Sequence, residues 1–359
     1  MSRCRKPFCG VLLCLLVLGA SCSDGPRPVS REWATMGTFA AVSVPAADAA
    51  ELDRCVRDAA DVFSGINDAL TVYTKTSELS AVNRNAGYGA VAVSASSGEA
   101  VAAALKYAEL SEGYFDPTIA PLVRLWGFNN GTAPASLPSA GDIRALLANT
   151  GFENVRLEPP VESDPNGNWQ VELMRTGMSL DLGGVAKGYA VDVCFEQLRD
   201  SGANNVMVNL GGNIRCCGEA RPGRSWRIGV RNPFNESRML GVLAVPDGWA
   251  VATSGNYERY VVIDGKRYTH IINPRTGYPV AGMAGVTVVA ATAVEADAMS
   301  TALFVMGCDE AAGILPNMPD CEALFVEDEQ PTAVRITPGF GQWFTPEDEF
   351  VDSVRIIPN

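Results

Sequence analysis

The sequence is poor in the residues that most metal and nucleic-acid sites require. It has one histidine, His270, so any imidazole chemistry must use that side chain. None of its ten cysteines forms a Cys-x-x-Cys pair or stands at a zinc-site spacing from a histidine. The 28 basic residues are outnumbered by 41 acidic ones, for a net charge of −13. This balance excludes nucleic-acid binding through phosphate neutralisation and offers no basic patch for anionic lipid.

The N-terminal apolar run, residues 11–18, is too short for a transmembrane helix. It follows three basic residues at positions 3, 5 and 6, and this arrangement is typical of a secretory signal peptide. Gly19, Ala20 and Ser21 lead into Cys22, which resembles a bacterial lipoprotein processing site, although such sites usually have an aliphatic residue where Gly19 stands. We therefore expect residues 1–21 to be a lipoprotein signal peptide, with Cys22 lipidated. An ordinary cleaved signal peptide, with Cys22 incidental, is the alternative.

This interpretation predicts an exported protein, lipid-anchored to a bacterial membrane and facing the periplasm or the cell exterior. Residues 22–31 are rich in serine, proline and glycine and are expected to be a tether. Residues 32–359 would form one catalytic domain. Six further cysteines, residues 55, 194, 216, 217, 308 and 321, could form disulfides in an oxidising compartment or remain as buried thiols, and their number does not decide between these states.

Hydrophobic patterns predict an α+β fold, with mixed β-sheets and packed helices in a single domain that could have two lobes. Helices and strands alternate without the regular cadence of a doubly wound sheet. Helices are expected at 46–69, 97–111, 185–200, 293–306 and 308–315. Strands are expected at 38–44, 168–174, 178–182, 205–210, 226–230, 240–245, 250–253, 257–263 and 286–290, and strands and turns at 323–356.

Two glycine-rich turns follow predicted strands. The first, residues 181–190, contains Asp181, Gly183, Gly184 and Lys187 at the start of a predicted helix. Backbone N–H groups at such a position can bind an anion, and Lys187 could add a positive charge beside a diphosphate. The spacing matches neither a P-loop nor the dinucleotide GxGxxG pattern, so a purely structural turn is the alternative. The second turn, residues 209–214, is equally consistent with a tight β-turn.

Two later segments carry groups suited to acid–base and metal chemistry. His270 titrates nearest neutral pH, as a base that deprotonates a hydroxyl would, although it could also be a hydrogen-bonded strand residue. Asp297 and Thr301 are four residues apart in a predicted helix and share one face. A carboxylate and a hydroxyl form an all-oxygen half-site that suits Mg²⁺, whereas the alternative is a solvated aspartate beside an ordinary threonine.

Read in order, these segments resemble the FAD:protein FMN transferase family, the ApbE family. The resemblance also includes residues 36–38, Tyr73, residues 77–80, Asn83 and the stretch 115–128, and it extends over about residues 33–350. It implies a single ApbE-like domain that binds FAD with Mg²⁺ and transfers FMN to a Ser or Thr hydroxyl of an acceptor protein, releasing AMP. The acceptor implied is an exported or membrane electron-transfer protein with a flavinylation motif.

The resemblance also implies roles for individual residues. Asp297, Thr301 and the carbonyl of Gly184 would bind Mg²⁺, and His270 would activate the acceptor hydroxyl. The other implied FAD-binding residues are Met36, Tyr73, Tyr114, Phe115, Asp116, Asp181, Lys187 and Ile272, with His270 also near the diphosphate.

The sequence departs from the family pattern where Asn273 replaces a common aspartate and where Cys216 and Cys217 replace small or aliphatic residues. Neither departure removes an implied Mg²⁺ or nucleotide ligand. Two other activities would use the same residues: hydrolysis of FAD to FMN and AMP, and flavin binding without catalysis.

Overall fold

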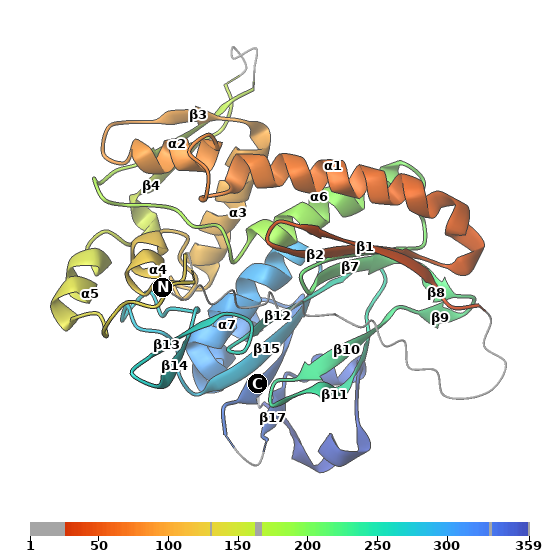
Figure 1. Ribbon diagram of the computed structural model, residues 1–359. Helices are drawn as coiled ribbons and strands as arrows, with labels where there is room; N and C mark the ends of the chain where they lie inside the picture. The colour runs from red at the N-terminus through yellow and green to blue at the C-terminus, as the bar shows by residue number, and fades with distance from the viewer. Residues whose placement is uncertain (1–25, 130, 162–166, 330–331, 358–359) are drawn as a thin grey trace, which may run out of the picture.

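The computed structural model describes residues 26–129, 131–161, 167–329 and 332–357. The expected signal peptide and Cys22 lie outside these residues. A nine-stranded sheet forms the centre of the described chain (Figure 1). Its strands, in spatial order, are β1 (Val29–Thr35), β2 (Thr38–Val44), β6 (Val206–Leu210), β7 (Asn213–Cys217), β12 (Ala250–Gly255), β15 (Met283–Ala290), β16 (Cys321–Glu327), β17 (Val334–Ile336) and β19 (Val354–Ile356).

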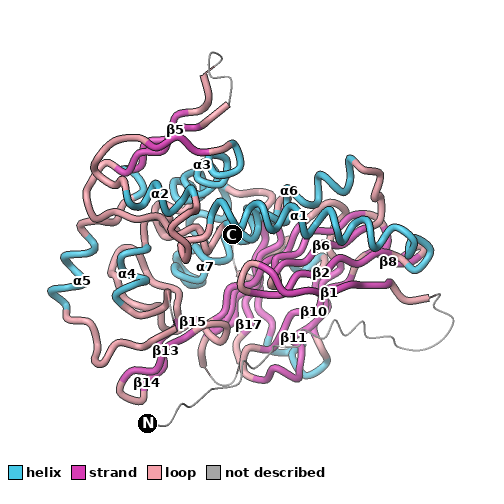
Figure 2. Tube along the Cα trace, turned by 45° about the horizontal axis from the view of Figure 1, so that its top comes forward, coloured by secondary structure: helices cyan, strands magenta, loops and turns pink. Residues whose placement is uncertain are grey.

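Helices cover one face of this sheet. Three of them, α1 (Leu52–Leu70), α6 (Ala186–Asp200) and α7 (Ala293–Ile314), pack on its strands and on each other (Figures 1 and 2). Side chains such as Val208, Ala252 and Val288 alternate toward these helices and form the main core. Burial of this apolar surface is the dominant stabilising contribution to the fold.

A smaller three-stranded sheet lies on the opposite side. It contains β10 (Arg227–Asn232), β11 (Asn235–Ala244) and β18 (Phe344–Pro346). The intervening residues of the central strands, such as Met207, Val251 and Val289, pack with this sheet in a second core. Because both faces of the central strands are covered, these strands have continuous apolar runs rather than a polar–apolar alternation.

The remaining elements form a smaller apolar cluster beside the main core. Leu122 and Trp126 pack there with Val261 and Ile263. The elements not yet given are α2 (Glu78–Arg84), α3 (Ala95–Leu110), α4 (Ala120–Leu125), α5 (Ala140–Leu147), β3 (Val91–Val93), β4 (Val155–Glu158), β5 (Trp169–Leu173), β8 (Glu219–Arg221), β9 (Arg224–Ser225), β13 (Tyr260–Ile263), β14 (Lys266–Thr269) and 3-10 turns at Ala46–Glu51, Phe152–Asn154, Leu315–Asn317, Phe340–Gln342 and Asp348–Ser353.

The predicted α+β class is confirmed, and the long helices lie where the apolar spacing places them. The two helices expected at 293–306 and 308–315 are one element, α7, interrupted where Gly307 has φ 74° and ψ 177°. The segment Ala293–Asn317 is apolar and long enough to span a membrane by composition, but it packs against β12 and β15 as a core helix.

Two predictions about local structure are wrong, one about a strand and one about the end of the tether. Residues 178–182 alternate like a strand, with Met178, Leu180 and Leu182 buried, yet they pair with no strand in the described chain. Asn83 explains the difference: its Oδ1 accepts from Leu180 N at 2.6 Å, and its Nδ2 donates to Leu180 O at 2.9 Å. In addition, residues 29–31 of the expected tether belong to β1, where they pair with β2.

The described cysteines, Cys55, Cys194, Cys216, Cys217, Cys308 and Cys321, are all buried free thiols. Cys216 and Cys217 are neighbours in β7 and therefore point to opposite faces of the sheet, Cys216 into the second core and Cys217 into the main core. They cannot pair with each other in this strand geometry.

Candidate functional site

Several of the motif segments meet at one edge of the central sheet. The antiparallel register places the start of β2 beside the β6–β7 turn, since Ala40 is opposite Leu210. The end of β12 lies at the same edge, and Ser254 there is opposite Val286 of β15. Sequence segments separated by more than 200 residues thus converge because neighbouring strands run in opposite directions.

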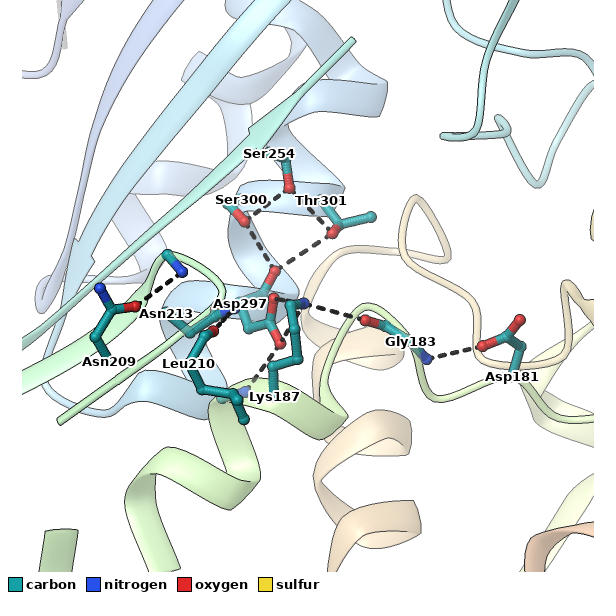
Figure 3. Close-up of polar contacts among 12 residues, drawn as sticks. Asp181, Gly183, Lys187, Asn209, Leu210, Asn213, Ser254, Asp297, Ser300 and Thr301 are labelled. Carbon is teal, nitrogen blue, oxygen red and sulfur yellow. Dashed lines mark hydrogen bonds and ion pairs between the residues drawn. The ribbon is translucent and has the colours of Figure 1, made fainter. Parts of the chain in front are cut away.

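The centre of the site is Asp297, on the first half of α7. Its side chain is 6% exposed, and Oδ1 lies 3.1 Å from the ammonium of Lys187, on the first turn of α6. Oδ2 accepts a hydrogen bond from Gly188 N at 2.9 Å (Figure 3). A buried carboxylate requires such compensation, because an unpaired charge away from water is costly.

Hydroxyl groups surround the next turn of α7. Thr301 Oγ1 lies 3.3 Å from Ser254 Oγ of β12 and donates to Asp297 O at 3.3 Å. Ser300 Oγ lies 2.9 Å from Ser254 Oγ and also donates to Asp297 O, at 2.9 Å (Figure 3). Asp297 and Thr301 therefore share one helix face, as their spacing predicts. Ser254 and Ser300 extend the group of oxygen atoms, and the spacing argument alone had not identified them.

Gly184 is packed tightly beside this group. A Cβ at this position would lie 3.0 Å from Phe115 Cε2 and 3.3 Å from Thr301 Oγ1. The backbone of residue 184 therefore lies close to Thr301. Phe115 is 5% exposed and forms the apolar wall next to it.

The glycine-rich turn before α6 is held by its own side chains. Asp181 Oδ1 accepts from Gly183 N at 2.8 Å, and Lys187 Nζ donates to Gly183 O at 3.3 Å (Figure 3). Two N–H groups of the segment 181–190, those of Gly183 and Gly188, therefore have protein acceptors in this structure. Lys187 is the positively charged side chain of this turn.

His270 follows β14 directly and is fixed by Arg259. The carbonyl of Arg259 accepts from His270 N at 3.1 Å and lies 3.0 Å from the ring Nδ1. Because a carbonyl accepts only, Nδ1 carries the proton, and Nε2 of the neutral ring keeps a free lone pair. Burial lowers the pKa of His270 to about 4, and the positive charges of Arg259 and Lys187 act in the same direction. The ring is therefore neutral at pH 7.

Glu258 is a member of the site that the sequence analysis missed. Desolvation by the surrounding protein raises the pKa of Glu258 to about 7, in spite of the opposing charge of Lys187. Asp297 acts on it in the same direction as the desolvation. Its side chain nevertheless reaches solvent. The charges of Lys187 and Asp297 both act on Glu258, so it lies in the neighbourhood of that pair. The sequence signal that could have identified Glu258 is its position, one residue after the motif 253–257.

The β1–β2 turn reaches the same area. Met36 and Gly37 both have positive φ, 47° and 68°, as in a type I′ hairpin. This conformation is strained for methionine. A Cβ on Gly37 would lie 3.9 Å from the guanidinium of Arg259, so the turn adjoins the residue that fixes His270.

Other predicted ligand-binding residues have different environments. Asp116 is buried, and its oxygens accept from Thr118 and from Phe152 N, so it shapes its own loop. Ile272 is 5% exposed and packs in the cluster of Leu122 and Trp126.

The two predicted tyrosines lie at the periphery. Tyr73 is 68% exposed on the loop after α1. Tyr114 stacks under the guanidinium of Arg275, 3.7 Å from the ring centroid. The structure therefore places these two rings outside the Lys187–Asp297–Thr301 group.

Asp192 holds two helices of the site together, and Asn213 has a buried polar atom. Asp192 of α6 accepts from Ala293 N at 2.9 Å and Val294 N at 2.8 Å, which holds the first turn of α7 against α6. It also pairs with Arg215 at 2.9 Å. Asn213 Oδ1 is buried without a hydrogen-bond partner among the described residues, which is the condition of a polar atom available to a ligand.

A separate cavity of about 530 Å³ lies at the other end of α7. Its lining includes Cys308, Glu327 and Arg335. None of the predicted site residues lines it, so the chemistry is assigned to the sheet edge.

The polar centre thus consists of oxygen donors and one lysine, the chemistry of a protein that binds a phosphate ester beside a hard cation. The family model described as "ApbE family" matches residues 36–325, and the chain belongs to this family.

The sequence of this chain is similar to those of known relatives over most of their length. An FAD:protein FMN transferase of Vibrio cholerae is 35% identical over 306 residues, which cover 83% of this chain and 87% of the relative. One from Treponema pallidum is 31% identical over 368 residues, covering 99% and 97%. Among solved structures, the ApbE protein of Thermotoga maritima has a TM-score of 0.76 at 31% identity, covering 89% of this chain and all of that one.

Proposed function

We propose that this chain is an enzyme, an FAD:protein FMN transferase, that moves FMN from FAD to a hydroxyl of an acceptor protein. The relatives named above carry that activity in their names, and the match covers most of this chain. The observation that carries the proposal is the meeting of Asp297, Thr301, Gly184 and Lys187 at one sheet edge, with His270 close enough to respond to the charge of Lys187.

We further propose Mg²⁺ as the cation of this site. The donors fit, because the Asp297 carboxylate, the Thr301 hydroxyl and the Gly184 carbonyl are all oxygens, and Ser254 adds another hydroxyl. No cluster of three or more His, Cys, Asp or Glu side chains occurs in the described residues, so the ligand set depends on hydroxyl and carbonyl groups. When bound, Mg²⁺ would neutralise diphosphate charge and stabilise the departing AMP.

Side chains of this protein would supply the charge stabilisation and the proton transfer that the reaction needs. Lys187 pairs with Asp297 here, and its ammonium, released from that carboxylate, can turn to the diphosphate of FAD. His270 Nε2 accepts the proton of the acceptor hydroxyl. The hydroxyl oxygen then forms a bond to the phosphorus of the FMN half while the diphosphate P–O bond to AMP breaks. AMP leaves with the bridging oxygen, and the product is a phosphoester between FMN and the acceptor.

Export and lipid anchoring remain part of the proposal and rest on residues 1–22 alone. A lipid-anchored enzyme on the outer side of a bacterial membrane would meet exported or membrane electron-transfer proteins, which we propose as acceptors. Mass spectrometry of the protein from untreated and globomycin-treated cells tests this point: we expect an N-terminal lipidated Cys22 without the inhibitor and the uncleaved precursor with it. An unlipidated N-terminus at any residue other than Cys22 would refute the anchor.

The decisive assay combines the protein with FAD, Mg²⁺ and an acceptor domain that carries an exposed Ser or Thr flavinylation motif. We expect covalent flavin on the acceptor and one AMP for each flavin transferred. Free FMN with an unmodified acceptor would instead identify an FAD hydrolase. FAD binding without any AMP would identify a flavin-binding protein and refute the enzyme proposal.

A further inference from the structure

The outward face of the β13–β14 hairpin carries apolar side chains that the fold does not use. In β13, Val261 and Ile263 are buried against the cluster of Leu122 and Trp126. Between and before them, Tyr260 is 50% exposed and Val262 is 53% exposed. The hairpin projects at the margin of the molecule, away from the central sheet (Figures 1 and 2). Neighbouring apolar side chains on one exposed strand face are a usual feature of protein contact surfaces.

This face continues directly into the site. Tyr260 is opposite Thr269, the residue before His270, and Arg259 holds both the backbone and the ring of His270. Val262 is opposite Arg267, three residues before His270. At the rise of an extended strand, the outer end of the face is about 10 Å from the imidazole. A polypeptide whose hydroxyl reaches His270 can therefore extend over this hairpin.

The charge of the hairpin region opposes that of the whole chain. Residues 258–275 contain four basic side chains and two acidic ones, whereas the chain has a net charge of −13. Arg267 lies over the Tyr260 ring at 3.8 Å and donates to Asn256 O at 2.6 Å, so its guanidinium is held on the exposed face. Lys266 is also exposed, but it is opposite Ile263 and therefore belongs to the other side of the hairpin, beside the turn. A local positive field on an acidic protein directs an acidic partner to this face.

We propose that the outer face of the hairpin, defined by Tyr260, Val262 and Arg267, is the docking surface for the acceptor protein. The acceptor segment that flanks the modified hydroxyl is acidic and contributes at least one apolar side chain to Tyr260. This inference rests on the proposed transferase activity and adds the chemistry by which the enzyme selects its protein substrate.

The test is a charge series at Val262, measured with the FAD–acceptor assay above. Val262→Glu places a carboxylate opposite Arg267, and Val262→Lys places an ammonium at the same exposed position. Since both residues are tolerated on an exposed strand, damage to the fold would shift both variants in the same direction. Docking of an acidic segment predicts opposite shifts: the KM for the acceptor rises about fivefold in Val262→Glu and falls about threefold in Val262→Lys. The affinity for FAD stays unchanged in both.

Matched controls separate this surface from general effects. Tyr260→Ala removes an aromatic contact and should raise the KM for the acceptor about tenfold, whereas Tyr88→Ala, at a 77% exposed tyrosine elsewhere, should leave it unchanged. Arg57→Glu on the exposed side of α1 is the control for added negative charge.

Each outcome decides a separate point. If the wild-type protein transfers no flavin, the proposed transferase function fails, and the docking proposal that rests on it fails as well. If the wild type transfers flavin but both Val262 variants keep its KM, or move it in the same direction, the docking surface is refuted. The same refutation follows if the variants alter only binding to vesicles of anionic phospholipid, because the hairpin would then be a membrane contact.

Discussion

Replacement of Gly188 by alanine should move Lys187 and the first turn of α6 away from Asp297 on α7. A Cβ at residue 188 would lie 2.7 Å from the carbonyl carbon of Ala293 and 2.7 Å from Val294 Cα. Real Cβ atoms do not approach backbone atoms this closely, and the backbone of an N-terminal helix turn cannot rotate away as a side chain can. The first turn of α6 must therefore move from α7 by about 1 Å.

This displacement acts on the chemistry more than on the fold. Gly188 N donates to Asp297 Oδ2, and Lys187 precedes it, so the movement carries both partners away from the carboxylate. Strain of this kind costs about 2 kcal/mol in the free energy of unfolding. A displacement of about 1 Å between reacting groups costs on the order of 100-fold in kcat/KM.

The matched control is Gly313→Ala in the last turn of α7, where an added Cβ meets no atom within 4 Å. Alanine is a better helix former than glycine, so this variant should gain about 0.8 kcal/mol and keep its activity. Urea unfolding followed by tryptophan fluorescence gives the stability, and AMP release gives the rate. A Gly188→Ala protein that is destabilised as expected but turns over at the wild-type rate would refute the argument that this contact aligns the site.

Four further predictions concern the side chains of Asp297, His270 and Asp192. Asp297→Ala should abolish turnover that depends on added Mg²⁺, measured by titration of the metal; activity at the wild-type level would exclude Asp297 as a ligand. His270→Gln should lower kcat by about 100-fold or more with little change in FAD affinity, and an equal loss of both would contradict its role as a base. In the wild type, the acid limb of kcat/KM should lie near pH 4, because His270 stays neutral until the pH falls through its lowered pKa; a limb near pH 6.5 would contradict this environment. Asp192→Asn, which keeps the shape but removes the charge facing Ala293 N, Val294 N and Arg215, should destabilise the protein by about 2 kcal/mol in urea, and an unchanged midpoint would show that the contact is dispensable.

The sequence predicted the local elements well where side-chain periodicity decides the structure. The helix containing Asp297 and Thr301 follows from apolar spacing, and their shared face follows from the helical repeat. The turn around Asn273 follows from its residue types, and Asn273 Oδ1 does accept from Arg275 N. These features depend on a few neighbouring residues, which the sequence lists directly.

Features that depend on distant partners were not accessible in this way. Residues 178–182 have the pattern of a strand, but Asn83, almost 100 positions away, supplies the hydrogen bonds that a neighbouring strand would give. The lowered pKa of His270 arises from desolvation by residues distant in the sequence, and no local spacing reports it.

The sequence by itself determined which chemical groups are present: one imidazole, a carboxylate–hydroxyl pair on a helix, a lysine after a glycine turn and, by resemblance, the family. Only the tertiary structure decided which of these groups meet. It joins Lys187 to Asp297 and Ser254 to Thr301, and it leaves Asp116 and Ile272 to support their own loop and core. The physical reason is that backbone periodicity sets the direction of a side chain, whereas antiparallel strand register and helix packing set its partner.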